Sequence, residues 1–238
     1  MLKKILLSLA SISSLTQAAE LEITLTNATQ GVYFTPVLLA AHSTPGELFR
    51  VGTQASSALE ALAEGGSIDA ANTNLLNASA NIAEGAADAP GASDGPVAPG
   101  GSFTVTLTTD DNNPYLSLAS LLLPTNDGFV GLDSWKIPET QGTYVINLNA
   151  YDAGTEANDE LATSIPNAPF VTSFGTPGDS GAVTSGGTGI TASGDENARV
   201  HIHRGNVGDL DTTGGASDID ASKHRWLNPV ARLVITVQ

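Results

Sequence analysis

The feature that most constrains the fold is a two-residue alternation of apolar and polar side chains that returns in separate segments. Residues 20–27 read ELEITLTN, and residues 102–109 and 231–238 repeat the pattern as SFTVTLTT and ARLVITVQ. Successive side chains of an extended strand point to opposite faces, so this period predicts strands that bury one face. We expect such strands to pair in antiparallel sheets.

Other segments complete an all-β prediction. The run YLSLASLLLP at 115–124 is almost continuously apolar, as expected in a sandwich core, and GTYVINLNAYD (142–152) and ARVHIHRG (198–205) add two strands. Residues 47–66 instead have helical spacing, and Gly65 and Gly66 end that helix. The sequence predicts an antiparallel β-sandwich with one main helix and long Gly-rich loops, at 74–101 and 174–197.

The first nineteen residues have a different character. MLKK is basic, ILLSLASISSL is apolar, and TQA ends the segment with small residues. This order is typical of a secretory signal peptide, with cleavage expected after Ala18 or Ala19; a buried N-terminal helix is the alternative. The apolar run is too short to span a bilayer, and no later segment reaches that length. We therefore expect a single domain at 20–238, secreted, periplasmic or at the cell surface, and the absence of Cys favours a bacterial protein.

The charge of the chain narrows the choice of partners. There are 25 acidic and 9 basic residues, for a net charge of −16. Such a surface repels nucleic acid and anionic membranes, and it attracts divalent cations or simply keeps the protein soluble. The acids are also clustered, since NAYDAGTEANDE at 149–160 holds four carboxylates and no base. Solubility does not explain that cluster.

Four motifs occur together in the order of a known family. They are LFRVGTQASSALEALAEGG (48–66), LSLASLLLPTNDGFVGLD (116–133), NAYDAGTEAND (149–159) and NPVARLVITV (228–237). In order and spacing the chain resembles the spondin N-terminal domain family, and among its members the stand-alone bacterial proteins. The resemblance implies a β-sandwich similar to calcium-dependent membrane-binding domains, one bound Ca²⁺ and, from the animal members, a role in matrix attachment or cell-surface adhesion. We do not expect an enzyme, since no nucleophile–base pair or three-His site stands out in the sequence.

The resemblance also implies which residues bind the calcium. The corresponding positions are Asp127, Asp152 and Glu156, and the third departs from the animal pattern, which has Asp there. Asn158 or Asp159 is an alternative third ligand. The chemistry agrees, because Ca²⁺ prefers hard oxygen ligands and a Gly-containing turn lets nearby carboxylates converge on one ion. The alternative is that Asp152 only caps the following segment or closes an Asx turn.

Three further segments are candidates for metal or partner binding, and each also has a purely structural interpretation. Residues 209–220 resemble an EF-hand loop, with candidate ligands Asp209, Asp211, Thr213 and Asp220, but Thr at position five and Asp at twelve favour a solvated turn region. His201 and His203 alternate in one strand and are candidates for a Zn²⁺ or Cu²⁺ pair, with His224 or Asp209 as third ligand; a polar face packed on a loop is the favoured interpretation.

The last site is a basic, aromatic spot on an acidic protein. Arg225 and Trp226 lie in KHRWLNP and are candidates for binding a partner, although Trp226 is favoured as a residue that closes one end of the sandwich. The function expected from the sequence is that of a secreted calcium-binding adhesion module whose partner is an extracellular protein or glycan. The alternatives are a metal-dependent hydrolase that uses the same acidic loops and a purely structural periplasmic or matrix protein.

Overall fold

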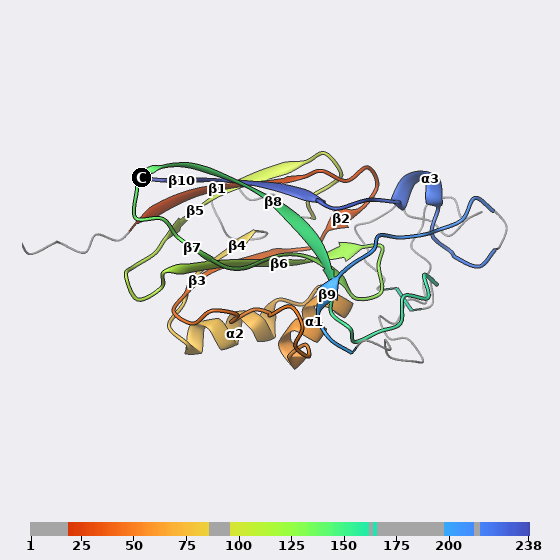
Figure 1. Ribbon diagram of the computed structural model, residues 1–238, viewed down its shortest axis with the longest axis horizontal. Helices are drawn as coiled ribbons and strands as arrows, with labels where there is room; N and C mark the ends of the chain where they lie inside the picture. Colours follow the sequence, from red (N-terminus) through yellow and green to blue (C-terminus); the bar gives the residue numbers. More distant parts are fainter. Residues whose placement is uncertain (1–18, 86–95, 162–163, 166–197, 212–214) are drawn as a thin grey trace, which may run out of the picture.

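Two β-layers, with two helices against one of them, make up the part of the chain that the structure describes (Figure 1). The computed structural model describes residues 19–85, 96–161, 164–165, 198–211 and 215–238. The predicted signal peptide and the expected Gly-rich loop at 174–197 therefore fall almost wholly outside the described residues. The predicted all-β class and antiparallel sandwich are confirmed.

The strands form one antiparallel sheet that folds over on itself. The two edge strands of its path contact each other, so the sheet is nearly closed. Along the path the order is β4 (Asn81–Gly85), β3 (Val37–His42), β6 (Tyr115–Leu123), β7 (Gly128–Lys136), β8 (Gly142–Asp152), β10 (Ala231–Val237), β1 (Glu20–Asn27) and β5 (Ser102–Thr108). Two short strands lie off this path: β2 (Tyr33–Phe34) pairs with β6, and β9 (His201–Ile202) pairs with β8.

The layer of β5, β1, β10 and β8 has one buried and one solvated face. Leu21, Ile23 and Leu25 of β1 are fully buried, while the residues between them face outward. On the outer face the hydroxyl groups of Thr24 and Thr104 hydrogen-bond across the β1–β5 pair at 2.8 Å. This explains the strict alternation in these segments, because each strand contributes one apolar face to the core.

The layer of β3, β6 and β7 is covered on both faces. Helices α1 (Ser57–Gly65) and α2 (Asp69–Asn77) lie on its outer side (Figure 1). Leu59 and Leu62 of α1 pack against Phe129 of β7 in a second hydrophobic cluster. A strand buried on both faces needs no polar side, so β6 is apolar almost throughout.

The helix boundaries follow from local signals. Ser56 is the N-cap of α1, since its hydroxyl accepts a hydrogen bond from the Leu59 N–H. Gly66 ends the helix with φ of 68°, as its position in the sequence predicts. The helix is shorter than the periodic segment that begins at Glu47, because Gly52, at φ of 85°, lies in a turn before it.

Two expectations are wrong in detail. Residues 74–101 are not one loop, because they contain the end of α2, where Leu75 is buried, and strand β4, which pairs with β3. β4 carries one large apolar residue, Ile82, and is a strand because it pairs with the edge of β3. The strand expected at 198–205 is only two residues long. Within the described residues there is no helix both long and apolar enough to cross a membrane.

Candidate metal centre

The turns that carry Asp127 and Asp152 are neighbours at one end of the sandwich. Asp152 is the last residue of β8, and it pairs with Gly128, the first residue of β7. Asp127 immediately precedes Gly128, so the β7–β8 ladder brings the two acidic residues together. The Ala153 N–H donates to the Asp127 carbonyl oxygen at 3.2 Å and holds the two turns in contact.

The Asp127 carboxylate is the most constrained group in this region. It is fully buried, and its Oδ2 accepts hydrogen bonds from the N–H groups of Thr155 (2.8 Å) and Glu156 (3.1 Å). Its Oδ1 is equally buried and has no hydrogen-bond partner among the described residues. A buried carboxylate oxygen without a donor is costly, so a cation at this atom would be stabilising.

The electrostatics of Asp127 reflect this environment. Burial, and then the neighbouring charge of Asp152, raise the pKa of Asp127 to about 6. The two backbone hydrogen bonds and the charge of His203 oppose the rise in pKa without cancelling it. Near neutral pH the group is thus an anion that its surroundings penalise, as expected of a carboxylate placed to meet a cation.

Asp152 is buried as well, but each of its oxygens has a donor. Oδ1 accepts from the Gly154 N–H at 2.8 Å, and Oδ2 accepts from Asn158 Nδ2 at 2.6 Å. The first contact is the Asx turn considered from the sequence. His201 Nδ1 lies 3.8 Å from Oδ1, near enough for an ion pair when the imidazole is protonated.

Gly154 makes this turn possible. Its φ is 72°, and a Cβ built on it would lie 2.4 Å from the backbone nitrogen of Arg199. A side chain at this position would therefore push the segment before β9 away from the acidic turn.

The remaining acids of 149–160 are distributed among separate partners. Asp159 Oδ1 accepts hydrogen bonds from Asn126 Nδ2, the Leu161 N–H and Ser164 Oγ at 2.9, 3.0 and 2.6 Å. The Glu160 carboxylate accepts from the N–H groups of Val207 and Gly208 at 2.6 and 2.8 Å. Amide and hydroxyl donors thus compensate most of the acidic cluster, and a cation is not needed for each carboxylate.

Glu156 and Glu64 complete the acidic surroundings. Glu156 is buried, and its N–H bonds to Asp127. Burial raises the pKa of Glu64, in α1, while the Thr155 side chain opposes the rise and the charges of Glu60 and Asp127 add to it. Glu64 thus lies near Asp127, although no sequence motif groups this helical residue with these turns. Even so, the described residues include no set of three or more His, Cys, Asp or Glu side chains arranged to hold a metal.

The second acidic loop uses its carboxylates locally. Asp209 accepts hydrogen bonds from the N–H groups of Asp211 (3.0 Å) and Ser217 (3.1 Å). Asp220 caps the short helix α3 (Ala221–His224) by accepting from the Ser222 N–H at 2.8 Å, and it pairs with Lys223 at 3.3 Å. Thr213 lies outside the described residues. These contacts are those of a turn region, and metal binding at this loop stays a prediction.

The two histidines of the short strand differ in environment. His201 is partly exposed beside Asp152, whereas His203 is buried, with Nε2 3.2 Å from Asn158 Oδ1 and Nδ1 accepting from the Gly205 N–H at 3.0 Å. The His203 N–H donates to Ala150 O at 3.1 Å, so pairing with β8 continues past the two-residue strand, and His201 and His203 both lie near the Asp127–Asp152 pair. Metal binding by these histidines stays a prediction. The ring of His203 packs on Trp226, with centroids 4.9 Å apart.

Trp226 belongs to the core. It is 7% exposed, and it is part of the cluster between the two β-layers, as the closing role predicts. Its neighbour Arg225 is exposed. Of this pair, therefore, Arg225 alone faces solvent.

Comparison with known proteins agrees with the motifs in the sequence. The model of the Spondin_N family matches residues 26–173, which include Asp127, Asp152 and Glu156 but not the loop at 209–220. A search of curated proteins gave no match. The family match covers more than half of the chain, and the protein therefore belongs to the spondin N-terminal domain family.

Proposed function

We propose that the protein is an extracellular binding and adhesion module that holds one Ca²⁺ between the turns of Asp127 and Asp152. Its family is one of extracellular-type domains and not a known family of enzymes. The observation that carries the proposal is the buried Asp127 Oδ1, which has no donor among the described residues and lies next to a second buried carboxylate.

The residues present suit calcium better than a softer metal. Asp127 and Asp152 supply hard oxygen ligands, and the charge of Asp127 acts on Glu64, while Glu156 follows directly on the same turn and bonds to Asp127 through its backbone N–H. Ca²⁺ takes six to eight oxygen ligands and accepts carbonyl groups and water among them, so two carboxylates are a sufficient nucleus. Bound there, the ion would cancel the repulsion within the pair and fix both turns.

The proposed role in recognition follows from where the pair lies. Both turns are at the end of the sandwich that also carries β9, α3 and the most exposed aliphatic side chains. Loops fixed on a rigid sheet are the usual location of binding surfaces. The proposed partner is an extracellular protein or glycan, bound without turnover.

Thermal unfolding with calcium and with a chelator tests the calcium part of the proposal. An ion that binds only the folded state raises Tm by mass action. We expect a calcium-dependent rise in wild type and its loss in Asp127→Asn and in Asp152→Asn. Glu22→Gln, on the solvated face of β1, is the matched control and should keep the full rise.

Binding to arrays of glycans and matrix proteins tests the adhesion part. The expected result is binding that chelator removes, with no hydrolysis of any ester or glycoside. Turnover that is lost in Asp152→Ala would favour the hydrolase instead. Binding that chelator leaves unchanged would separate adhesion from the calcium site.

A further inference from the structure

Strand β8 belongs to both layers of the sandwich, and part of one of its edges has no partner strand among the described residues. Residues 142–148 pair with β10, and residues 149–152 pair with β7. Strand β8 therefore passes from one layer to the other along its length (Figure 1). Over residues 142–148 the edge that faces away from β10 is open, and we call this the β8 edge.

The ladders determine which backbone groups point out of the β8 edge. The Gln238 N–H donates to Glu20 O at 3.0 Å, which marks a hydrogen-bonded pair between β10 and β1. Hydrogen-bonded and non-hydrogen-bonded pairs alternate along an antiparallel ladder, so even-numbered residues of β10 bond to β1 and odd-numbered ones to β8. Through the register of β10 with β8, the N–H and C=O groups of Thr143, Val145 and Asn147 point away from β10.

The β8 edge lacks the features that protect most exposed strands. Edge strands commonly carry charged side chains, Pro or a bulge, which prevent pairing with another chain. Residues 142–151 read GTYVINLNAY and contain no charged residue and no Pro, in a chain with a net charge of −16. The neighbouring edge of β7 carries Asp133 and Lys136, and Ser134 lies at a bulge in its pairing with β6. The sequence thus protects the edge of β7 and leaves the β8 edge able to pair.

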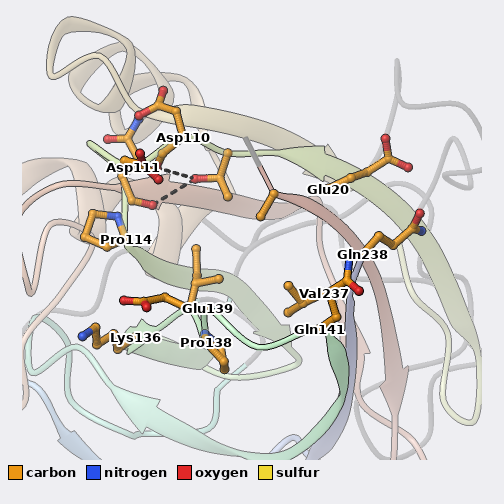
Figure 2. Close-up of a pocket in the computed structure, with 14 residues that line it drawn as sticks. Glu20, Asp110, Asp111, Pro114, Lys136, Pro138, Glu139, Gln141, Val237 and Gln238 are labelled. Carbon is orange, nitrogen blue, oxygen red and sulfur yellow. Dashed lines mark hydrogen bonds between the residues drawn. The ribbon is translucent and has the colours of Figure 1, made fainter. Parts of the chain in front are cut away.

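The connection from β7 to β8 is held at the end of the sandwich. The Ile137 N–H donates to Pro114 O at 2.9 Å, which ties the start of this connection to the turn between β5 and β6. Glu139 and Gln141 then line a pocket whose other wall carries Asp111 of that turn (Figure 2). The connection is therefore directed across the end of the two layers rather than along the β8 edge.

We propose that two copies of the protein pair through their β8 edges, in an antiparallel dimer with Val145 of one copy opposite Val145 of the other. The outward backbone groups are two residues apart and symmetric about Val145. Those of residues 143, 145 and 147 therefore meet those of residues 147, 145 and 143, so the edge is its own complement in register. The same surface is used by both copies, and the contact closes as a two-fold dimer.

The side chains at the β8 edge suit a second copy. Val145 is 52% exposed, and Thr143 and Asn147 are exposed beside it. In the dimer two β-branched side chains meet at the two-fold axis, and Thr143 of each copy lies opposite Asn147 of the other, where both are able to hydrogen-bond. Two copies that each carry a charge of −16 repel each other, so an uncharged edge favours their approach.

Antiparallel pairing also sets the direction of the two copies. Strand β8 ends at Asp152, so the two acidic turns lie at opposite ends of the dimer. Where these turns bind a partner, which rests on the function proposed above, one dimer joins two partners. The dimer itself needs no calcium.

Sedimentation velocity of the purified protein in chelator, over a wide concentration range, tests the dimer. Chelator excludes bridging of carboxylates by a metal. The test variants are Val145→Lys and Val145→Glu, which each place like charges opposite one another at the two-fold axis. Val145→Thr is the matched control, because it keeps an uncharged, β-branched side chain. The side chain at this position is half exposed, so all three variants should fold.

The expected pattern is specific to this register. Wild type and Val145→Thr form a dimer as concentration rises and no larger species, whereas Val145→Lys and Val145→Glu each stay monomeric. An equimolar mixture of the two charged variants restores a dimer, which high salt weakens because it screens the charge pair. Hydrogen exchange should show protection of the Thr143, Val145 and Asn147 amides only in the dimer, and protection of Tyr144 and Ile146 in both states.

Three results count against the proposal. A wild-type monomer at every concentration would overturn it outright. A dimer that Val145→Lys retains would assign self-association to a different surface. Failure of the mixed charged variants to dimerise would show that residue 145 does not face its own copy. None of these results depends on calcium, so the proposed metal site stands or falls separately.

Discussion

Asp152 lies directly opposite Gly128 in the β7–β8 ladder, and this pairing sets its carboxylate beside that of Asp127. A shift of one residue in the register would turn one of the two side chains to the other face of the sheet. The acidic pair is thus a product of strand pairing, although its residues are 25 positions apart in the chain. A substitution at either residue therefore changes the local charge and can also affect the packing of the two turns.

The first prediction concerns the pH dependence of stability without calcium. The pKa of Asp127 rises from 3.8 to about 6 on folding, chiefly through burial. The stability that this group contributes is fully present below its unfolded pKa and is lost as pH rises through about 6. In chelator, Asp127→Asn should therefore gain free energy of unfolding relative to wild type between pH 4 and pH 7, by roughly 3 kcal/mol.

Urea unfolding at several pH values, with and without calcium, checks this prediction. A bound cation favours the ionised carboxylate, so added Ca²⁺ should remove the advantage of Asp127→Asn at neutral pH. If Asp127→Asn and wild type have the same free energy of unfolding at every pH in chelator, folding does not raise the pKa of Asp127, and the prediction fails.

The second prediction concerns His224. Burial lowers its pKa from 6.5 to about 4, so its contribution to stability is present above pH 6.5 and is lost as pH falls through about 4. This trend opposes that of Asp127, and Asp127→Asn is therefore the right background in which to measure it. In the Asp127→Asn background, the free energy of unfolding should fall by roughly 3 kcal/mol as pH is lowered from 6.5 through about 4, and His224→Gln should remove most of this fall. Equal sensitivity to acid with and without the imidazole would contradict the prediction.

The third prediction uses two glycines that differ in environment. Gly154 has φ of 72° and no room for a Cβ, whereas Gly65, in the last turn of α1, faces open space. Gly154→Ala should destabilise the protein by more than about 1 kcal/mol and weaken its calcium response. Gly65→Ala should leave the calcium response intact and raise stability by roughly 0.5–1 kcal/mol. The Tm values of both variants, with calcium and with chelator, decide the matter; equal effects would count against the tight turn.

The fourth prediction separates the two acidic loops. The Asp209 carboxylate accepts hydrogen bonds from the N–H groups of Asp211 and Ser217, so Asp209→Asn should lower Tm slightly. The rise in Tm on adding calcium should stay as large as in wild type. Loss of the increment in this variant, together with its retention in Asp127→Asn and Asp152→Asn, would move the site to residues 209–220. Differential scanning fluorimetry of the three variants is sufficient.

The features that the sequence predicts well are those with a strong local signal. The alternation at 20–27 and 231–238 predicts strands that bury one face, and the continuous apolar run at 115–124 predicts the covered strand β6. The motifs suggest that the turns of Asp127 and Asp152 lie together, and the β7–β8 ladder does place Asp152 beside the turn of Asp127. In each case the local period and the long-range pairing agree.

What the sequence does not predict depends on tertiary contacts. Strand β4 is short of large apolar side chains and exists because β3 offers it a free edge. The backbone donors that satisfy Glu160 come from residues 207 and 208, and no local pattern relates these positions. Glu64 approaches Asp127 only because α1 packs on β6 and β7. Positions like these are set by packing across the chain rather than by neighbouring residues.

The most direct test of the central claim is a crystal structure of the protein grown with calcium. The account predicts an ion bonded to Asp127 Oδ1 and to the Asp152 carboxylate at about 2.3–2.6 Å, with further oxygen ligands from the same turns and from water. A calcium-saturated crystal in which both carboxylates keep their present hydrogen bonds and no ion lies between them would contradict it.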